Sequence, residues 1–229
     1  MDEKLIIKGK TKDLYDIGAG QYKLYFKDDM TGENGVFDPG ANTVGLTVEG
    51  AGMAGLAMSK YYFEKLNAAG IKTHYIDADV EARTMTVVPS QVFGKGLEII
   101  CRYKALGSFV RRYNSIVDAE TPLPQGLVEI TIKSDESGDP LITKEALEAL
   151  NILATGEYET ITTATRNICQ LLKDDLEAKG LELCDIKLEF GKSPAGDIVL
   201  IDEISAGNMR VRENGAGVSP LDLSKKVLS

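Results

Sequence analysis

The chain has 229 residues, a formal net charge of −9 and 43% hydrophobic residues, values typical of a folded protein large enough for two lobes. No run is long enough to span a bilayer and the start does not resemble a signal peptide, so we expect a cytoplasmic protein with no membrane partner. An acidic chain is also a poor candidate for nonspecific nucleic-acid binding, which depends on neutralising phosphates. Overall acidity does not exclude a local basic pocket for a small anion.

The cysteine and histidine content narrows the chemistry. The three cysteines are widely separated and lie among apolar residues, which predicts buried thiols in a reducing compartment: Cys101, Cys169 and Cys184. The one histidine is His74, and no spacing is typical of a zinc site. The chemistry is therefore expected among carboxylates, lysines and arginines.

The first third of the chain is rich in predicted strands. Strands are expected at 5–7, 13–17, 22–26 and 84–89, and a helix at 57–66. Residues 32–55 are rich in glycine, which predicts either a loop with positive φ angles or a close approach of backbone to a ligand.

Strands and helices alternate in the rest of the chain. The patterns predict strands at 97–103, 128–133, 183–190 and 198–204, a short helix at 144–150 and a long helix at 157–179. No repeat or linker-like tract interrupts the sequence. We therefore expect two lobes of one functional unit, with a β-rich lobe at 1–90 and a mixed lobe at 91–229.

The predicted hairpin near the C-terminus carries the most informative charge pattern. The two-residue period of a strand places Asp185, Lys187 and Glu189 on one face. A register that closes the turn brings Asp202 beside or diagonal to Glu189, and two such carboxylates could hold Mg²⁺ against nucleotide phosphates. A solvated face of an antiparallel sheet is the alternative interpretation.

Two further segments concentrate cations. Lys10 and Lys12 straddle one residue of a predicted tight turn, from which both could reach phosphate oxygens. Residues 102–108 with Arg111 and Arg112 join a strand end to a helix start, a setting that suits anion binding. The alternatives are ordinary surface lysines and an exposed basic helix face.

Together these segments resemble one protein family. Residues 9–15 match its GK-x-K-x-x-Y motif, and 102–108 match RN-x-x-x-GS with Tyr103 in place of Asn. Six more segments follow the family's order: 26–31, 70–74, 133–135, 138–141, 185–191 and 202–205. The chain is thus similar to the SAICAR synthetase (phosphoribosylaminoimidazole-succinocarboxamide synthase) family from about Lys8 to Arg210.

The resemblance implies an α+β fold with an ATP-grasp-like nucleotide site between a β-rich N-terminal lobe and a mixed C-terminal lobe. It implies an ATP- and Mg²⁺-dependent ligase of purine biosynthesis. The carboxylate of carboxyaminoimidazole ribonucleotide would be converted to an acyl phosphate, and the amine of L-aspartate would then displace phosphate.

The resemblance also implies roles for particular residues. Lys10 and Lys12 would bind ATP phosphates, and Glu189 and Asp202 would hold the metal. The ribonucleotide phosphate would be bound by Arg102, Ser108 and Arg210. The positions around aspartate and the reacting carboxylate are Lys133, Asp135, Asp185 and Lys187, with Asp185 as a candidate proton acceptor.

Departures from the family pattern leave alternatives open. Gly207 stands where many members carry an acidic residue, and Gly55 and Leu56 replace an Asn pair. A related ligase, a small-molecule kinase acting on another acceptor, and a regulatory nucleotide-binding protein without turnover are the competing hypotheses. The glycine-rich segment with Val36 and Phe37 would suit a subunit contact in a homo-oligomer.

Overall fold

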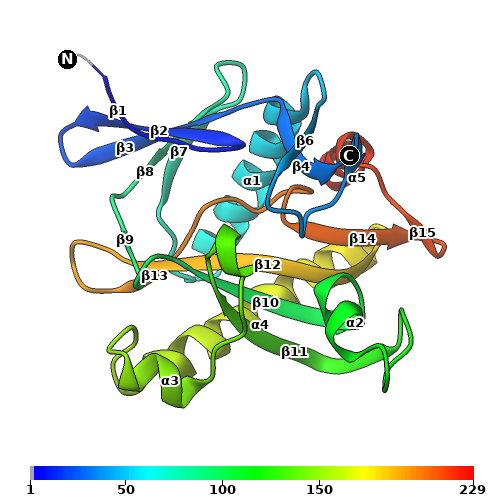
Figure 1. The fold of residues 1–229 in the computed structure, drawn as a ribbon. Helices are drawn as coiled ribbons and strands as arrows, with labels where there is room; N and C mark the ends of the chain where they lie inside the picture. Colours follow the sequence, from blue (N-terminus) through cyan, green and yellow to red (C-terminus); the bar gives the residue numbers. More distant parts are fainter. Residues whose placement is uncertain (1–2) are drawn as a thin grey trace. The chain divides into compact units, whose positions relative to one another are not determined.

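The computed structural model describes residues 3–229. Helices make up 28% and strands 37%, and together they form a mixed α+β fold. Figure 1 shows the arrangement of these elements. The chain divides into two compact units. The first contains the described residues up to Ser90 together with Glu203–Asn208 and Val218–Ser229. The second contains Gln91–Asp202 and Met209–Gly217.

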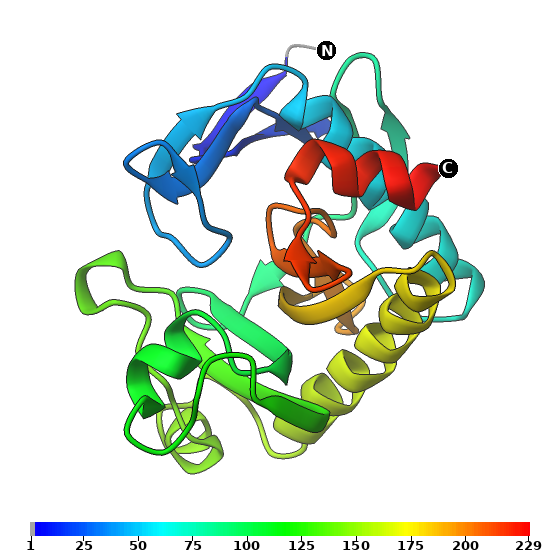
Figure 2. The same ribbon diagram turned by 90° about the vertical axis from the view of Figure 1, so that its right-hand side faces the viewer.

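The first unit is built on two antiparallel sheets and two helices. The larger sheet has the order β1-β2-β3-β8-β7, formed by Lys4–Lys8, Lys12–Gly18, Gln21–Phe26, Thr84–Val87 and Tyr75–Asp79. The smaller has the order β5-β4-β6, formed by Val36–Phe37, Asp29–Glu33 and Val44–Thr47. Helix α1 (Ala51–Ala68) packs with α5 (Pro220–Leu228), whose Ser224 hydroxyl donates to the carbonyl of Ala54 at 2.8 Å. Figure 2 shows these two helices side by side.

The glycine-rich segment 32–55 includes parts of β4, β5 and β6 and the start of α1, so a loop with positive φ angles, one of its two predicted interpretations, describes only the turns between them. Helix α1 begins at Ala51, six residues before the predicted start. The backbone N–H of Gly52 donates to the Asp28 carboxylate at 2.9 Å. A Cβ at Gly52 would lie 2.7 Å from the carbonyl oxygen of Phe26. Here glycine allows a helix to begin against a neighbouring backbone, a purpose that composition alone does not distinguish from a loop.

The second unit contains a seven-stranded sheet whose centre is β12 (Glu182–Lys192). The path is β11-β10-β12-β14-β15, and β13 and β9 also pair with β12. The other strands are Pro122–Ile132 (β11), Leu97–Lys104 (β10), Met209–Glu213 (β14), Ala216–Gly217 (β15), Ile198–Ile201 (β13) and Gln91–Val92 (β9). The helices are α2 (Ser108–Tyr113), α3 (Lys144–Ala149) and α4 (Glu157–Ala178), with a 3₁₀ turn at Asp135–Ser137.

The long helix α4 covers this sheet through contacts with β10, β11 and β12 (Figure 1). Its buried residues include Ile161, Ile168, Leu172 and Leu176, which repeat at the helical period as predicted. The predicted hairpin around residues 192–196 is confirmed, but its second strand ends at Ile201 instead of 204. Asp202 has a φ of 68°, and this left-handed conformation ends the strand.

The prediction of buried thiols is confirmed. All three cysteines are free and buried, and His74 is buried with its ring 5.4 Å from that of Phe63. Across residues 3–229, no helix has the length and apolar character needed to cross a membrane.

Replacing Gly52 with alanine is predicted to destabilise the first unit. The added Cβ would approach the carbonyl oxygens of Phe26 and Lys27 to 2.7 and 2.8 Å, so the helix start would have to shift. We expect a loss of about 1–3 kcal/mol, as for other overpacked sites, measured by urea unfolding. Gly55→Ala is the control, because its Cβ would make ordinary contacts at 3.7 Å and alanine favours the helix by up to about 1 kcal/mol. Equal effects of the two substitutions would contradict the steric explanation.

Candidate active site

A row of charges crosses three strands of the second unit. The register places Arg102 of β10 opposite Asp185 of β12, and Asp185 opposite Arg210 of β14. Asp185 Oδ2 accepts from Arg102 Nη1 at 3.2 Å and from Arg210 Nη1 at 2.9 Å. Arg102 and Asp185 are buried, so the alternative of a fully solvated charged face on β12 is wrong.

The segment after β10 adds a hydroxyl to this row. Arg102 Nη2 donates to Ser108 Oγ at 2.9 Å, and Ser108 is the first residue of α2. Gly107 has a φ of 53°, and a Cβ there would lie 2.8 Å from Arg210 Nη2. The glycine therefore lets the chain turn tightly against the Arg210 guanidinium. The structure thus brings together Arg102, Ser108 and Arg210, which the resemblance assigns to the ribonucleotide phosphate, and adds Asp185, which it assigns to a neighbouring position.

A second cluster lies further along β12. Glu189 pairs with Ile201, the last residue of β13, and Asp202 follows in a left-handed conformation, close enough for its charge to act on Glu189. Burial raises the pKa of Glu189, and the charge of Asp202 raises it further. Lys133 Nζ donates to Glu189 Oε1 at 2.8 Å. Burial acts to lower the pKa of Lys133, but Glu189 and Asp202 outweigh burial and raise that pKa.

Of the other predicted residues of the second unit, Lys187 lies near this cluster. Lys187 Nζ donates to Glu98 Oε1 at 2.7 Å, and Glu98 Oε2 also accepts from the Thr131 hydroxyl at 3.2 Å. Asp135 is exposed and opens the 3₁₀ turn two residues after Lys133. Among residues 3–229, no group of three or more His, Cys, Asp or Glu side chains is arranged to hold a metal.

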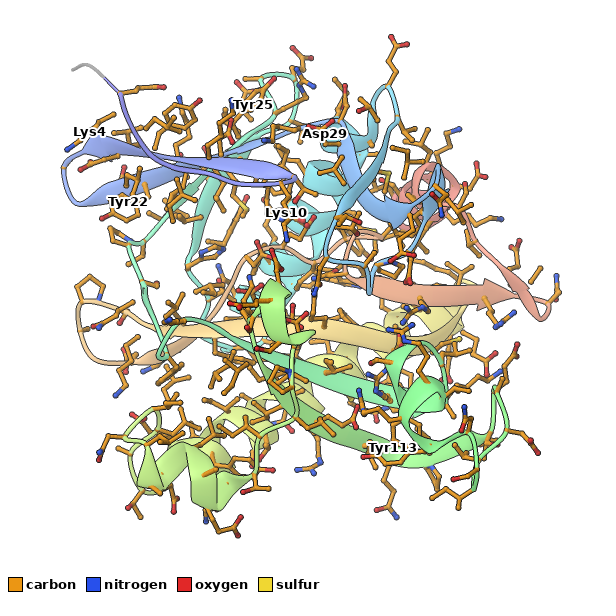
Figure 3. The ribbon with its side chains drawn as sticks, viewed as in Figure 1. Lys4, Lys10, Tyr22, Tyr25, Asp29 and Tyr113 are labelled. Carbon is orange, nitrogen blue, oxygen red and sulfur yellow. The ribbon has the colours of Figure 1, made fainter. Side chains whose placement is uncertain are left out.

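The two N-terminal lysines belong to the first unit. Lys10 projects from the turn between β1 and β2 (Figure 3), and Lys12 begins β2. Lys12 Nζ donates to Glu203 Oε1 at 2.5 Å, and both side chains are nearly buried. Glu203 also accepts from the Ser205 hydroxyl, and Lys27 donates to the carbonyl of Gly9. These contacts hold the turn and fix Lys12, whereas Lys10 is exposed.

Sequence reasoning missed three glutamates that accept hydrogen bonds from the predicted cations: Glu98, Glu129 and Glu203. A signal was present for one of them, since Glu98 and Arg102 share a face of the predicted strand 97–103. The hypothesis of an exposed basic helix face holds for Arg111, which is exposed. It also holds for Arg112, which is exposed, although its Nη2 donates to Glu129 Oε1 at 2.6 Å.

Comparison with known proteins identifies the family. The family model described as SAICAR synthetase matches residues 5–228. The chain belongs to the SAICAR synthetase family. A relative from Clostridium tetani, named phosphoribosylaminoimidazole-succinocarboxamide synthase, is 53% identical over 98% of this chain and 99% of its own length. One from Thermotoga maritima with the same name is 36% identical over 91% of this chain and 85% of its own.

Solved structures agree with this membership and with the α+β fold. A SAICAR synthetase in complex with ADP superposes with a TM-score of 0.82 at 30% identity, covering 92% of this chain and 86% of that one. A phosphoribosylaminoimidazole-succinocarboxamide synthase from Ehrlichia chaffeensis gives a TM-score of 0.82 at 27% identity, covering 93% and 86%. The family is one of ligases in purine biosynthesis.

Replacing Asp202 with asparagine is predicted to stabilise the protein in the absence of divalent cations. The substitution removes the charge that raises the pKa of Glu189, and asparagine tolerates the left-handed backbone at 202. Because the pKa of Glu189 is higher in the folded protein than in the unfolded chain, the free energy of unfolding falls as pH rises through that pKa. The variant should therefore lose less stability than the wild type over this pH range. Urea unfolding in a chelator from acidic to neutral pH measures this.

The matched control for this prediction is Asp118→Asn, the same chemical change at an exposed position. Parallel stability–pH curves for wild type and Asp202→Asn would contradict the repulsion between Asp202 and Glu189. The catalytic rate of Asp202→Asn should nevertheless fall sharply if Asp202 belongs to the active site.

Proposed function

We propose that this chain ligates L-aspartate to the carboxylate of carboxyaminoimidazole ribonucleotide, using ATP. The terminal phosphoryl group of ATP is transferred to the carboxylate, which gives an acyl phosphate and ADP. The aspartate amine then attacks the acyl carbon, forming the amide bond as phosphate leaves. The observation that supports this reaction best is the row Arg102–Asp185–Arg210, centred on a buried carboxylate, in a chain of the SAICAR synthetase family.

The row suits a phosphorylated ribonucleotide. Arginine binds phosphate through paired N–H groups, and Arg102 is held in place by its neighbours before any ligand arrives. Ser108 accepts a hydrogen bond from Arg102, and the Arg210 guanidinium lies against Gly107, the residue before Ser108. We therefore assign Arg102, Ser108 and Arg210 to the ribonucleotide phosphate.

Lys10 and Lys12 are proposed to contact the ATP phosphates. A family member has been solved with ADP, which favours nucleotide use by this chain as well. Glu203 holds Lys12 before binding, so the nucleotide would meet one fixed and one exposed cation. Fixed cations stabilise charge on a transferring phosphoryl group without reorganising during the reaction.

Glu189 and Asp202 fit a Mg²⁺ ion. Burial and the charge of Asp202 raise the pKa of Glu189, and a divalent cation bound between the two carboxylates would offset that cost of ionisation. Two protein carboxylates are a usual number for Mg²⁺, which keeps water and phosphate oxygens as its other ligands. Bound there, the ion would offset negative charge on the phosphates. Lys133 supplies part of that positive charge already.

Lys133, Asp135 and Lys187 are assigned to aspartate and the reacting carboxylate, and Asp185 to the proton of the amine. Both lysines have a carboxylate partner in the second unit, so their positions are fixed relative to β12. The proposed location is the cytoplasm, since three free cysteines suit a reducing compartment. A homo-oligomer is also proposed, with the exposed Val36 of β5 at the subunit contact.

Purified protein incubated with the ribonucleotide, ATP, Mg²⁺ and L-aspartate is expected to form the succinocarboxamide product, identified by mass. Other amino acids serve as controls. Phosphoryl transfer that leaves a stable phosphorylated acceptor without aspartate would favour a small-molecule kinase instead. Nucleotide binding with no ADP formed at saturating substrates would favour a regulatory protein.

Asp185→Asn tests the proposed proton acceptor. The amide is nearly isosteric but a far weaker base, so turnover should fall by about 100-fold or more, the range of general base catalysis. The substitution also weakens the hold on Arg102 and Arg210, so the KM for the ribonucleotide should rise as well. Near-normal kcat at saturating ribonucleotide would exclude Asp185 as the acceptor.

A further inference from the structure

Glu129 of β11 divides its carboxylate between two arginines. Oε2 accepts from Arg102 Nε at 2.6 Å, and Oε1 accepts from Arg112 Nη2 at 2.6 Å. The Glu129 side chain is only 8% exposed. A buried carboxylate that bridges two cations in this way is strongly held, and it holds both partners in return.

These contacts extend the row into an alternating array of five charges: Arg112, Glu129, Arg102, Asp185 and Arg210. The three central side chains are buried, whereas the terminal arginines are 28% and 24% exposed. The array contains three cations and two anions, so it carries one net positive charge.

Helix α2 brings Arg112 to the same side as Ser108. The two residues are four apart in a helix, which places them on one face. Ser108 accepts from Arg102, and Arg112 shares Glu129 with Arg102. Arg102 and Arg112 therefore converge near the start of α2.

The donors of Arg102 are almost fully used. Nε donates to Glu129, Nη1 donates to Asp185 and to the carbonyl of Leu106, and Nη2 donates to Ser108. A guanidinium has five N–H groups, so these contacts leave one on Nη2, beside Ser108. The bond from Nε to Glu129 helps fix the plane of the guanidinium, and with it the direction of that N–H.

We propose that Glu129 is a positioning residue, which aims Arg102 and Arg112 at the phosphate of the substrate. This inference rests on the proposed function and adds Arg112 to the phosphate site. Two effects oppose each other when Glu129 loses its charge. The local positive charge increases, which favours an anion, but the arginines lose their common acceptor. Position should dominate, because a glutamine would turn its NH₂ group toward a guanidinium that can only donate.

Glu129→Gln tests the inference through steady-state kinetics. We expect the KM for the ribonucleotide to rise about tenfold or more, as for loss of a charged hydrogen bond, with kcat changed much less. The same ribonucleoside without its phosphate should react with the same kcat/KM in wild type and variant. If Glu129 had a merely structural role, the substitution would lower kcat/KM for both substrates to the same extent. Glu182→Gln is the matched control, since it removes an exposed carboxylate of the same sheet that pairs with Lys104.

Binding of ribose 5-phosphate, followed by the shift in thermal unfolding, separates this inference from the proposed function. Wild type should be stabilised and Glu129→Gln stabilised much less. Probe binding by wild type without product formation would overturn the proposed function alone. Three results would overturn the role of Glu129. Wild type and Glu129→Gln could bind ribose 5-phosphate equally, or the KM for the ribonucleotide could be unchanged or lower in the variant. The third is that wild type does not bind ribose 5-phosphate.

Glu129→Asp keeps the experiment informative if the glutamine variant does not fold. The aspartate retains the charge but is one methylene too short to bridge both arginines. It should therefore show a raised KM for the ribonucleotide as well, whereas wild-type kinetics would contradict positioning.

Discussion

Compensation of buried charge along β12 is the constraint around which the second unit is arranged. This strand pairs with four others and carries Asp185, Lys187 and Glu189 on one face. Each of these residues has a partner of opposite charge on another strand or just after one. Asp185 pairs with Arg102 and Arg210, Lys187 pairs with Glu98, and Glu189 pairs with Lys133. Removal of one member of a buried pair typically costs about 3–5 kcal/mol, so the charges hold the strands in register as well as preparing a site.

The same strand shows a conflict between stability and chemistry. Glu189 and Asp202 repel each other in a setting that disfavours ionised carboxyl groups, and Lys133 offsets only part of that cost. A protein selected for stability alone would replace one of the two acids. Functional sites are where such unfavourable contacts persist, because their purpose is realised only when a ligand is bound.

Local patterns in the sequence predicted much of the fold and part of the site. The period of two placed the three charged residues of β12 on one face, and the helical period identified α4. The partners of those charges were harder to find, because they depend on the strand order β11-β10-β12-β14, in which β12 lies beside strands distant in sequence. Resemblance to a family named Arg102 and Arg210 without showing that Asp185 joins them. Sequence patterns could not identify Glu129 for the same reason, because nothing near it in sequence indicates two arginine partners.

The alternating array also restricts how these positions can change during evolution. Substitution of Arg102, Asp185 or Glu129 alone leaves a buried charge without one of its partners, whichever residue is replaced. Viable change at one position therefore requires compensation at its neighbour on another strand. Among relatives, residues that are partners in the array should therefore change together, so an alignment of many sequences should show covariation between positions on different strands.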